Sequence, residues 1–426
     1  MNLNVPESRY PTVVIVGGGF AGLHTASALV KADFRVIMLD RHNYHTFQPL
    51  LYQVATAGLE PDSVAYPLRR ALQNTRNFFF RMTEVDRVIP ETNTLVTAIG
   101  PLHYDYLILA TGSTTNFFGN ANLEKYAYPM KSIPEALNLR SLILQQFEKA
   151  TLIRDERQKS ALMNFMIVGA GPTGVELAGA LAELKQNALP IDYPDLDVEK
   201  MNITLVEAGP RVLIAMSEKS SKNAKAYLEK LGVTVLLDTA VADYDGEKLT
   251  YVNGQSTYSK TLIWTAGVKG AAVQGPETAI NPRSNRIRTD EFNRVAGYDN
   301  IFAIGDVAEM TGEKWPKGHP MVAQVAIQQG GNLGKNLIRI QDGKDLKPFV
   351  YKDKGSMATV GKNKAVVDLP NLHISGRFAW FIWMFIHLLA LVGFRNKAIT
   401  FFNWVSNYWR YDKGIRLIIR PAEEKV

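Results

Sequence analysis

The sequence predicts an α/β protein built from two similar parallel-sheet units and a helical tail. Residues 13–22, VVIVGGGFAG, join a short apolar run to glycines spaced G-x-G-x-x-G. Residues 165–174, FMIVGAGPTG, repeat the same pattern. The third observation is an uncharged, aromatic stretch at residues 378–394. A buried strand, a glycine turn and a helix, occurring twice, predict two Rossmann-like doubly wound units.

The first unit is expected to begin with a strand at residues 13–16 and a helix after Gly22. Its glycines allow a tight turn and a close approach of the backbone to phosphates. The helix N-terminus adds free N–H groups and a partial positive charge. A second strand, residues 34–39, ends in Asp40, 18 positions beyond Gly22. An acidic residue there holds a ribose hydroxyl in dinucleotide-binding units, although a solvated Asp at a strand end is the alternative.

Two further strands complete the first unit. Residues 106–109 are apolar, and the turn at residues 110–112, Ala-Thr-Gly, would let backbone approach a ligand. Residues 300–306 form another buried run whose last residue is Asp306. Residues 41–61 are predicted to be a long connection without secondary-structure period, and long ordered loops of this kind are usually functional.

The second unit repeats this order. Strands are expected at residues 165–168, 202–206 and 261–264, with a helix at residues 175–184. The 202–206 strand ends in Glu207, and the last strand is followed by Thr265-Ala266-Gly267, which resembles the first closing turn. Residues 187–200, rich in Pro and Asp, look like an inserted loop. The repetition of a whole unit indicates an internal duplication.

Composition restricts the chemistry. The chain of 426 residues has no cysteine, which excludes disulfides, redox-active Cys pairs and thiolate-ligated iron–sulfur clusters. A length of this kind allows two or three domains. The first ten residues are polar and resemble no signal peptide, so the core of the protein is expected in the cytoplasm.

The tail carries most of the net charge. Of the net +7, residues 376–426 contribute +5, with eight Lys or Arg against three Asp or Glu.

Residues 378–394 would span about 25 Å as a helix, at the short end of what crosses a bilayer core of about 30 Å. A second, amphipathic helix is expected to follow, with a polar stripe of Thr400, Asn403, Asn407 and Arg410. Apolar helices with basic flanks indicate binding to an anionic membrane surface. The alternative is that these helices pack onto the protein's own core or onto a partner subunit. Nucleic acid is disfavoured because the basic residues form no continuous stripe.

Two dinucleotide units imply two nucleotides brought together. The economical pair is one bound FAD and one exchangeable nicotinamide cofactor, with hydride passing from the nicotinamide to the flavin. Because no iron–sulfur centre can relay electrons and no metal site is expected, the reduced flavin has to meet its acceptor directly. The lipophilic tail indicates an acceptor in the membrane.

The order of elements over residues 10–340 resembles the two-dinucleotide-domain flavoprotein reductases. Three features resemble type II NADH dehydrogenases more narrowly: residues 40–55, DRHNYHTFQPLLYQVA; residues 323–330, AQVAIQQG; and the basic aromatic tail. The resemblance implies a single-subunit NADH:quinone oxidoreductase on one membrane face that pumps no protons. The implied location is the cytoplasmic face of the inner membrane, as a peripheral protein.

The resemblance also implies site residues. The FAD site would comprise Gly17, Gly19, Phe20, Ala21, Gly22, Asp40, Arg41, Val85, Ala110, Thr111, Gly112, Asp306, Ala323 and Gln324. The NADH site would comprise Gly169, Gly171, Pro172, Thr173, Gly174, Glu176, Glu207, Ala266 and Gly267. A carboxylate at Glu207 would repel a 2′-phosphate, so NADH is expected over NADPH.

The implied catalytic residues are Glu176, near the nicotinamide, and Gln324, beside the flavin ring where a quinone would approach. Gln328, four residues further on, and His387 in the aromatic helix are added on the quinone side, although packing alone is the favoured interpretation of His387. Some relatives of this kind carry a lysine in the first tail helix, whereas residues 376–394 contain none.

The expected domains are an FAD domain at residues 1–118 and 282–375, an NADH domain at 119–281 and membrane-associating helices at 376–426. Expected partners are a membrane quinone and an anionic lipid surface. A homodimer is compatible with the sequence, which does not distinguish ubiquinone from menaquinone. The alternatives are a soluble ferredoxin or rubredoxin reductase and an NADH-sensing interaction protein similar to apoptosis-inducing factors.

Overall fold

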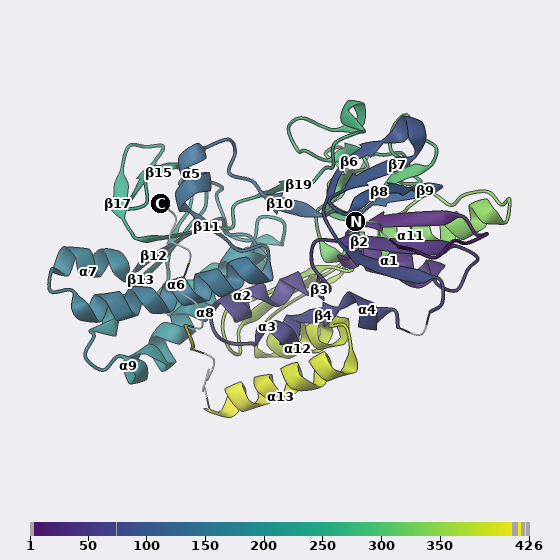
Figure 1. The fold of residues 1–426 in the computed structure, drawn as a ribbon. Helices are drawn as coiled ribbons and strands as arrows, with labels where there is room; N and C mark the ends of the chain where they lie inside the picture. Colours follow the sequence, from purple (N-terminus) through teal and green to yellow (C-terminus); the bar gives the residue numbers. More distant parts are fainter. Residues whose placement is uncertain (1–3, 74, 411–415, 419–421, 423–426) are drawn as a thin grey trace. The chain divides into compact units, whose positions relative to one another are not determined.

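Two five-stranded parallel sheets organise the chain (Figure 1). The computed structural model describes residues 4–73, 75–410, 416–418 and 422. The side chains of Asn407, Trp409 and Arg410, part of the expected amphipathic pattern, lie outside the described set, as does most of the chain after residue 410. The chain divides into unit 1, residues 1–45, 66–114 and 268–353, and unit 2, residues 46–65, 115–267 and 354–426.

The sheet of unit 1 has the order β21-β9-β1-β2-β5, and every neighbouring pair is parallel. Its strands are β1 (Thr12–Val16), β2 (Arg35–Asp40), β5 (Phe78–Met82), β9 (Tyr106–Leu109) and β21 (Ile301–Ala303). The central strand β1 is buried along its whole length, as expected for an apolar run covered on both faces. The carboxyl ends of β1 and β2 bring the first glycine loop and Asp40 to one edge of the sheet.

Two helices of unit 1 pack closely together. They are α1 (Phe20–Leu29) and α11 (Ala323–Gln341). A Cβ on Gly330 would lie 2.4 Å from the Ala21 carbonyl oxygen, and one on Gly334 would lie 2.6 Å from Ala28 Cβ. Glycine is therefore required for this approach of the two helices. The remaining elements of unit 1 are α4 (Leu68–Ala71), β6 (Val85–Ile89), β7 (Thr94–Thr97), β8 (Gly100–His103), β19 (Val268–Gly270), β20 (Ile287–Arg288) and β22 (Ala308–Glu309).

The sheet of unit 2 repeats the arrangement, with the order β11-β18-β12-β13-β14 and parallel pairing throughout. Its strands are β11 (Tyr128–Pro129), β12 (Asn164–Val168), β13 (Asn202–Val206), β14 (Thr234–Leu236) and β18 (Thr261–Trp264). The helices are α5 (Ala121–Tyr126), α6 (Ile133–Leu152), α7 (Glu156–Leu162), α8 (Pro172–Asn187), α9 (Leu189–Asp192) and α10 (Glu218–Lys230). The two sheets confirm the predicted α/β fold with parallel sheets.

Unit 2 also contains the last part of the chain. An antiparallel sheet of β23 (Ser356–Thr359), β24 (Ala365–Leu369) and β25 (Leu372–Gly376) leads into α12 (Arg377–Ala390) and α13 (Phe394–Arg410). A small antiparallel sheet, β15 (Val241–Tyr244), β16 (Lys248–Tyr251) and β17 (Ser256–Tyr258), completes it. The short helices α2 (Leu51–Ala55) and α3 (Pro61–Val64) belong to the same unit, and α2 contacts α6 and α8. Strands β3 (Tyr44–Thr46), β4 (Ala65–Pro67) and β10 (Ser113–Thr115) lie where the chain passes from one unit to the other.

The structure corrects two expectations. Residues 41–61 are not an irregular connection, because they contain α2, whose residues Leu51, Tyr52 and Val54 are buried. The aromatic stretch 378–394 is not one helix either: α12 ends at Ala390, and the chain turns at Gly393 with φ +83° before α13. Within the described ranges, no helix combines the length and the apolar character needed to cross a bilayer.

The expected loop at 187–200 contains the short helix α9 and a 3₁₀ turn at Val198–Lys200. The boundaries of the two units differ from the three domains expected from the sequence, since residues 354–375 belong to the unit that contains the second sheet. The assignment of nucleotides to domains stays a prediction.

Candidate functional site

The first glycine loop follows β1 in unit 1. Gly17 has φ +109°, and a Cβ there would lie 2.3 Å from the Ala110 carbonyl oxygen. Gly19 has no neighbour within 4 Å of an added Cβ, so the loop is open on that side. No side chain caps the N-terminus of α1. The loop therefore combines a tight turn with helix N–H groups that are available to an anion.

Asp40 holds this loop from the end of β2. Its Oδ2 accepts a hydrogen bond from the Gly18 N–H over 2.6 Å, and its Oδ1 accepts one from the His42 N–H over 2.7 Å. From the other side, His45 Nδ1 lies 3.0 Å from the Gly18 carbonyl oxygen, and burial lowers the pKa of His45 to about 4. Neutral His45 has to donate there from Nδ1. The N–H group and the carbonyl oxygen of Gly18 are therefore both hydrogen-bonded by side chains.

Two other predicted FAD residues of unit 1, Thr111 and Asp306, follow strands β9 and β21 of the same sheet. Thr111 Oγ1 donates to the Ala271 carbonyl oxygen over 2.6 Å, and Asp306 Oδ2 accepts from Ser113 Oγ over 2.5 Å. Gly305, which precedes Asp306, donates its N–H to the buried Gln329 Oε1 over 2.7 Å. Gln329 was not predicted as a site residue, and its amide joins the Asp306 turn to α11. Phe20, Ala21 and Gly22 begin α1, Arg41 is exposed, and Val85 begins β6.

The second glycine loop in unit 2 has nearly the same geometry. Gly169 has φ +101°, and a Cβ there would lie 2.5 Å from Ala266 Cα. A Cβ on Gly174 would lie 1.9 Å from the Gly169 carbonyl oxygen, and in the first loop a Cβ on Gly22 would lie equally close, 1.9 Å, to the Gly17 carbonyl oxygen. Gly171 is open, Pro172 and Thr173 are exposed, and α8 begins without a capping side chain. Gly267 follows Ala266 at the end of β18, with the Phe118 ring 2.9 Å from the position of an added Cβ.

Glu207 occupies the place in unit 2 that Asp40 has in unit 1. Its Oε2 accepts from the Ala170 N–H over 2.7 Å, and its Oε1 accepts from the Gly209 N–H over 2.8 Å. Each carboxylate therefore binds the N–H that follows the first loop glycine and another N–H two residues beyond itself. The match extends the internal duplication from sequence to hydrogen bonds.

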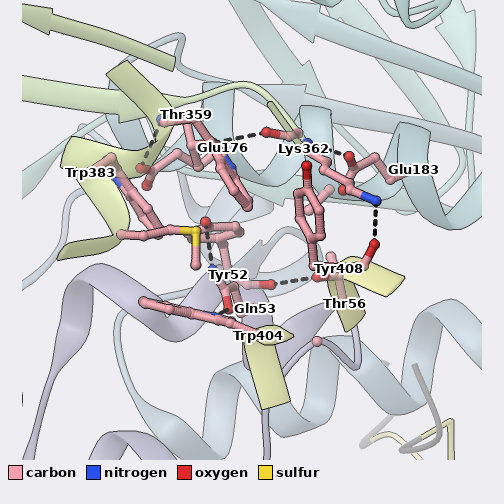
Figure 2. Close-up of a pocket in the computed structure, with 15 residues that line it drawn as sticks. Tyr52, Gln53, Thr56, Glu176, Glu183, Thr359, Lys362, Trp383, Trp404 and Tyr408 are labelled. Carbon is pink, nitrogen blue, oxygen red and sulfur yellow. Dashed lines mark hydrogen bonds between the residues drawn. The ribbon is translucent and has the colours of Figure 1, made fainter. Parts of the chain in front are cut away.

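Glu176, the predicted catalytic acid of the second unit, is buried in α8 and faces a cavity of about 110 Å³ (Figure 2). Burial raises the pKa of Glu176 to about 8, and its Oε1 lies 3.4 Å from the Thr359 N–H. The carboxyl group is accordingly protonated at neutral pH. We refer to this space as the aromatic cavity; it is lined by Tyr52, Gln53, Thr56, Gly58, Glu176, Ala180, Glu183, Thr359, Gly361, Lys362, Trp380, Trp383, Met384, Trp404 and Tyr408.

The walls of the aromatic cavity come from four stretches of unit 2: residues 52–58, 176–183, 359–362 and 380–408. Tyr52 and Gln53 belong to α2, Glu176 to α8, and Trp383 and Trp404 to the tail helices α12 and α13. The tail is fastened there by hydrogen bonds: Trp404 Nε1 donates to Gln53 Oε1 over 2.9 Å, and Asn403 Nδ2 donates to Glu60 Oε2 over 2.6 Å. Lys362 Nζ donates to the Tyr408 carbonyl oxygen over 2.6 Å, and its ammonium lies 4.3 Å from the Tyr408 ring centroid.

The predicted quinone-side residues are distributed differently. Gln324 lies in the first turn of α11 in unit 1, next to Ala323. Both ends of the Gln328 amide bond the backbone of Lys352, at 2.9 and 3.0 Å. His387 stacks on Trp383 with ring centroids 4.1 Å apart, donates from Nδ1 to the Trp383 carbonyl oxygen and does not line the aromatic cavity. Burial lowers the pKa of His387 to about 4, so its ring is neutral.

Sequence reasoning missed Tyr52, Gln53, Trp383, Trp404 and Lys362 as neighbours of Glu176. The aromatic residues of the 41–61 connection and of the tail were both noted, but no periodicity relates positions that are 350 residues apart. Among the residues that the structure describes, no group of three or more His, Cys, Asp or Glu side chains could hold a metal ion.

The comparisons with known proteins agree with this geometry. The family model described as pyridine nucleotide-disulphide oxidoreductase matches residues 11–330, and the NDH2 C-terminal domain matches residues 354–409. The fold and the paired glycine loops thus define a nucleotide-dependent oxidoreductase of the two-dinucleotide class. Disulfide chemistry of the protein itself is excluded, because the chain has no cysteine.

The relatives narrow the class. The type II NADH:quinone oxidoreductase Ndh of Mycobacterium tuberculosis is 36% identical over 96% of this chain and 90% of its own length. The type II NADH:quinone oxidoreductase of Staphylococcus aureus is 29% identical over 91% of this chain and 97% of its own length. The chain belongs to the type II NADH:quinone oxidoreductase family, which confirms the family, the enzyme class and the oxidoreductase function that the sequence predicted.

Solved structures agree at the level of the fold. NDH2 from Plasmodium falciparum in complex with NADH superposes with a TM-score of 0.88 at 24% identity, over 97% of this chain and 100% of that one. The sulfide:quinone oxidoreductase of Aquifex aeolicus superposes less well, with a TM-score of 0.71 at 19% identity over 91% of this chain and 92% of that one.

Proposed function

We propose that the chain binds FAD at the first glycine loop and NADH at the second, and passes two electrons to a membrane quinone without pumping protons. NADH gives up a hydride, and the quinone takes two electrons and two protons to become quinol, so one further proton comes from solution. When bound, the flavin supplies the redox centre between the two substrates. The observation that carries the proposal is the repeated loop geometry in a member of this family.

The residues of unit 1 fit FAD. An adenosine ribose would bind the Asp40 carboxylate, and the pyrophosphate would face the open side at Gly19 and the uncapped start of α1. Thr111, Gly112 and Asp306 would contact the more distant parts of the cofactor, and Gln324 would lie beside the flavin ring. These side chains and N–H groups fix the cofactor and need no cysteine.

The residues of unit 2 fit NADH by the same logic. Glu207 would bind the adenosine ribose, and residues 169–174 would bind the pyrophosphate. NADPH would bring a 2′-phosphate to a carboxylate that already accepts hydrogen bonds from the Ala170 and Gly209 N–H groups. This repulsion favours NADH.

The aromatic cavity is the proposed place of the quinone head group. Its walls are mostly aromatic, it contains the protonated carboxyl group of Glu176, and two of its walls are tail helices with exposed apolar side chains. A lipophilic substrate could enter this space from a membrane surface without crossing water. Glu176, placed beside the nicotinamide by sequence reasoning, is therefore proposed to contact the quinone.

The tail helices are proposed to lie on one membrane face. Their exposed apolar residues, which we call the apolar tail face, are Phe378, Phe381, Phe385, Ile386, Leu389, Phe394, Phe401, Phe402 and Val405. Phe385 is 62% exposed and Phe402 is 68% exposed, which is costly in water for such large side chains. Arg395 and Lys397 follow at the start of α13 and would attract anionic lipid. A peripheral position on the cytoplasmic face, and a homodimer, are part of the proposal.

The test is steady-state NADH oxidation by the purified full chain, with ubiquinone and menaquinone analogues compared side by side. We expect FAD to co-purify and each effective quinone to raise the rate well above the rate with oxygen alone. FAD-loaded protein that oxidises NADH without any quinone-dependent rate would contradict the proposal.

A further inference from the structure

Three side chains of unit 2 form a hydrogen-bonded row in the wall of the aromatic cavity (Figure 2). The Trp404 indole N–H donates to Gln53 Oε1 over 2.9 Å, and Gln53 Nε2 donates to the Tyr52 hydroxyl oxygen over 2.9 Å. Tyr52 is 5% exposed and Trp404 is 8% exposed. The row runs from tail helix α13 to a phenol of α2.

The chemistry of the three groups fixes the direction of the row. An indole nitrogen only donates, so the amide oxygen of Gln53 has to face Trp404. The amide nitrogen, which also only donates, then faces Tyr52 and makes the phenol oxygen the acceptor. Since a phenol has one proton, the Tyr52 proton is directed away from Gln53. No hydrogen bond among the described residues uses that proton.

The Tyr52 proton is retained at physiological pH. Burial raises the pKa of the Tyr52 hydroxyl well above its usual range, and the nearby Glu176 carboxyl raises it further. The cavity wall therefore presents a neutral O–H donor whose direction is set from the tail helix.

We propose that the Tyr52 hydroxyl donates a hydrogen bond to a carbonyl oxygen of the quinone head group, and that Gln53 and Trp404 hold it in the donating orientation. The inference rests on the proposed quinone site. An oxidised quinone carries carbonyl acceptors and no donor of its own, so the site has to supply donors. With the row reversed, the phenol would present only its oxygen to the quinone, and the hydrogen bond would be lost.

The first test removes the donor. Tyr52→Phe should raise the KM for quinone roughly three- to tenfold, the factor that corresponds to one neutral hydrogen bond. The rate of flavin reduction by NADH, measured by anaerobic rapid mixing, should stay within about twofold of wild type. A quinone KM unchanged within twofold overturns the proposal.

The second test reverses the row without removing bulk. In Gln53→Glu, both oxygens of the carboxyl group accept once it is ionised, so above the pKa of that group the Tyr52 proton turns toward position 53. We expect the quinone KM to rise about as much as in Tyr52→Phe, with FAD content unchanged. A Gln53→Glu enzyme whose KM for quinone matches that of wild type at every pH from 6 to 9 overturns the directional argument even if Tyr52→Phe fails to fold.

The third test is a double-mutant cycle. Trp404→Phe frees the Gln53 amide to rotate, so it should raise the quinone KM in the wild-type background and have no further effect in Tyr52→Phe. Trp380→Phe is the matched control: it removes an indole from the same cavity but not from the row, and its effect should add to that of Tyr52→Phe. Additive losses for Trp404→Phe and Tyr52→Phe overturn the coupling. Wild-type protein without quinone-dependent activity contradicts the proposed function instead.

Discussion

At the scale of single residues, the site is governed by buried groups whose charge state is set by their surroundings. Glu176 is 7% exposed and has no cation beside it among its described contacts. The desolvation cost of the carboxylate exceeds what the long Thr359 N–H contact returns, so the neutral acid is favoured. The side chains of Asp40 and Glu207 each accept hydrogen bonds from two backbone N–H groups.

The raised pKa of Glu176 predicts a pH dependence of stability. Between the unfolded value of 4.5 and the folded value of about 8, the folded protein binds the extra proton. The contribution of Glu176 to stability is therefore fully present below about pH 4.5 and is lost as pH rises toward 8, by a total of about 5 kcal/mol. We expect the melting temperature of wild type to fall between pH 7 and pH 8.5, above the range in which the buried His45 and His387 affect stability, and to fall less in Glu176→Gln.

The exposed Glu313 provides the control for this measurement. Glu313→Gln should keep the wild-type pH profile. Equal profiles for wild type and Glu176→Gln would show that Glu176 titrates near its ordinary pKa.

Glu207 predicts nucleotide preference. Glu207→Gln keeps one acceptor oxygen for backbone N–H groups but removes the charge that repels a 2′-phosphate. We expect kcat/KM for NADH to fall about tenfold, because a charged hydrogen bond contributes roughly 1.5–3 kcal/mol. The ratio of kcat/KM for NADH to kcat/KM for NADPH should fall toward one, because the repulsive charge is gone. Asp40→Asn should loosen FAD and leave the ratio unchanged. A ratio that moves with Asp40→Asn and not with Glu207→Gln would exchange the two assignments.

At the scale of elements, tertiary packing decides several structures that local sequence does not. Helix α2 has only five residues and includes an aromatic and a β-branched side chain, a poor helix by propensity. It forms because Leu51, Tyr52 and Val54 are buried in the unit that contains α6 and α8. Helix α12 stops before the apolar run ends, because Leu391 leaves the helical conformation with ψ 144°; Gly393 then turns the chain with a positive φ.

The contact of α1 with α11 predicts opposite effects for two neighbouring glycines. Gly330→Ala should destabilise unit 1 and accelerate loss of FAD, because its Cβ would meet the Ala21 carbonyl 2.4 Å away. Gly331→Ala, which has nothing within 4 Å, should stabilise the helix by about 0.5–1 kcal/mol. Thermal unfolding followed by flavin fluorescence measures both. A stable Gly330→Ala protein would mean that α11 shifts without cost.

The sequence predicted regular elements well and the site only in part. The strands predicted at 106–109, 202–206 and 261–264 match the structure. A short, mostly apolar run that is followed by a turn or an acidic residue favours a buried strand over other secondary structures. The hydrogen bonds of Asp40 and Glu207 agree with their position after the second strand of each unit. The aromatic cavity could not be predicted, because Tyr52, Glu176 and Trp404 meet only through the packing of four separate segments.

At the scale of the whole molecule, charge and apolar surface are concentrated at the end of the chain. Residues 376–426 contribute +5 of the net +7, and the apolar tail face belongs to the same segment. Removing the segment would also remove Trp383 and Trp404 from the interior of unit 2. Truncation therefore tests folding as well as membrane binding, and surface substitutions are the cleaner experiment.

Substitutions in the apolar tail face should separate membrane binding from catalysis. The pair Phe385→Ser and Phe402→Ser, made together, should weaken binding to anionic vesicles at least tenfold in flotation assays, because two large apolar side chains lose burial in lipid. Higher salt should weaken wild-type binding only in part. The double variant should retain FAD and reduce a water-soluble quinone at the wild-type rate. Unchanged flotation would assign the apolar tail face to a protein partner.

The matching glycine loops carry a consequence for engineering. The backbone of residues 17–22 and that of residues 169–174 bring glycine to the same conformation and place a carboxylate on the equivalent N–H. Under the proposed assignment, such loops would be interchangeable modules that recognise what all dinucleotides share. Whether a nucleotide stays bound through many turnovers or leaves after each one has to be determined outside them. A redesign that aims to change cofactor residence or identity should therefore leave both loops intact and alter the side chains around them.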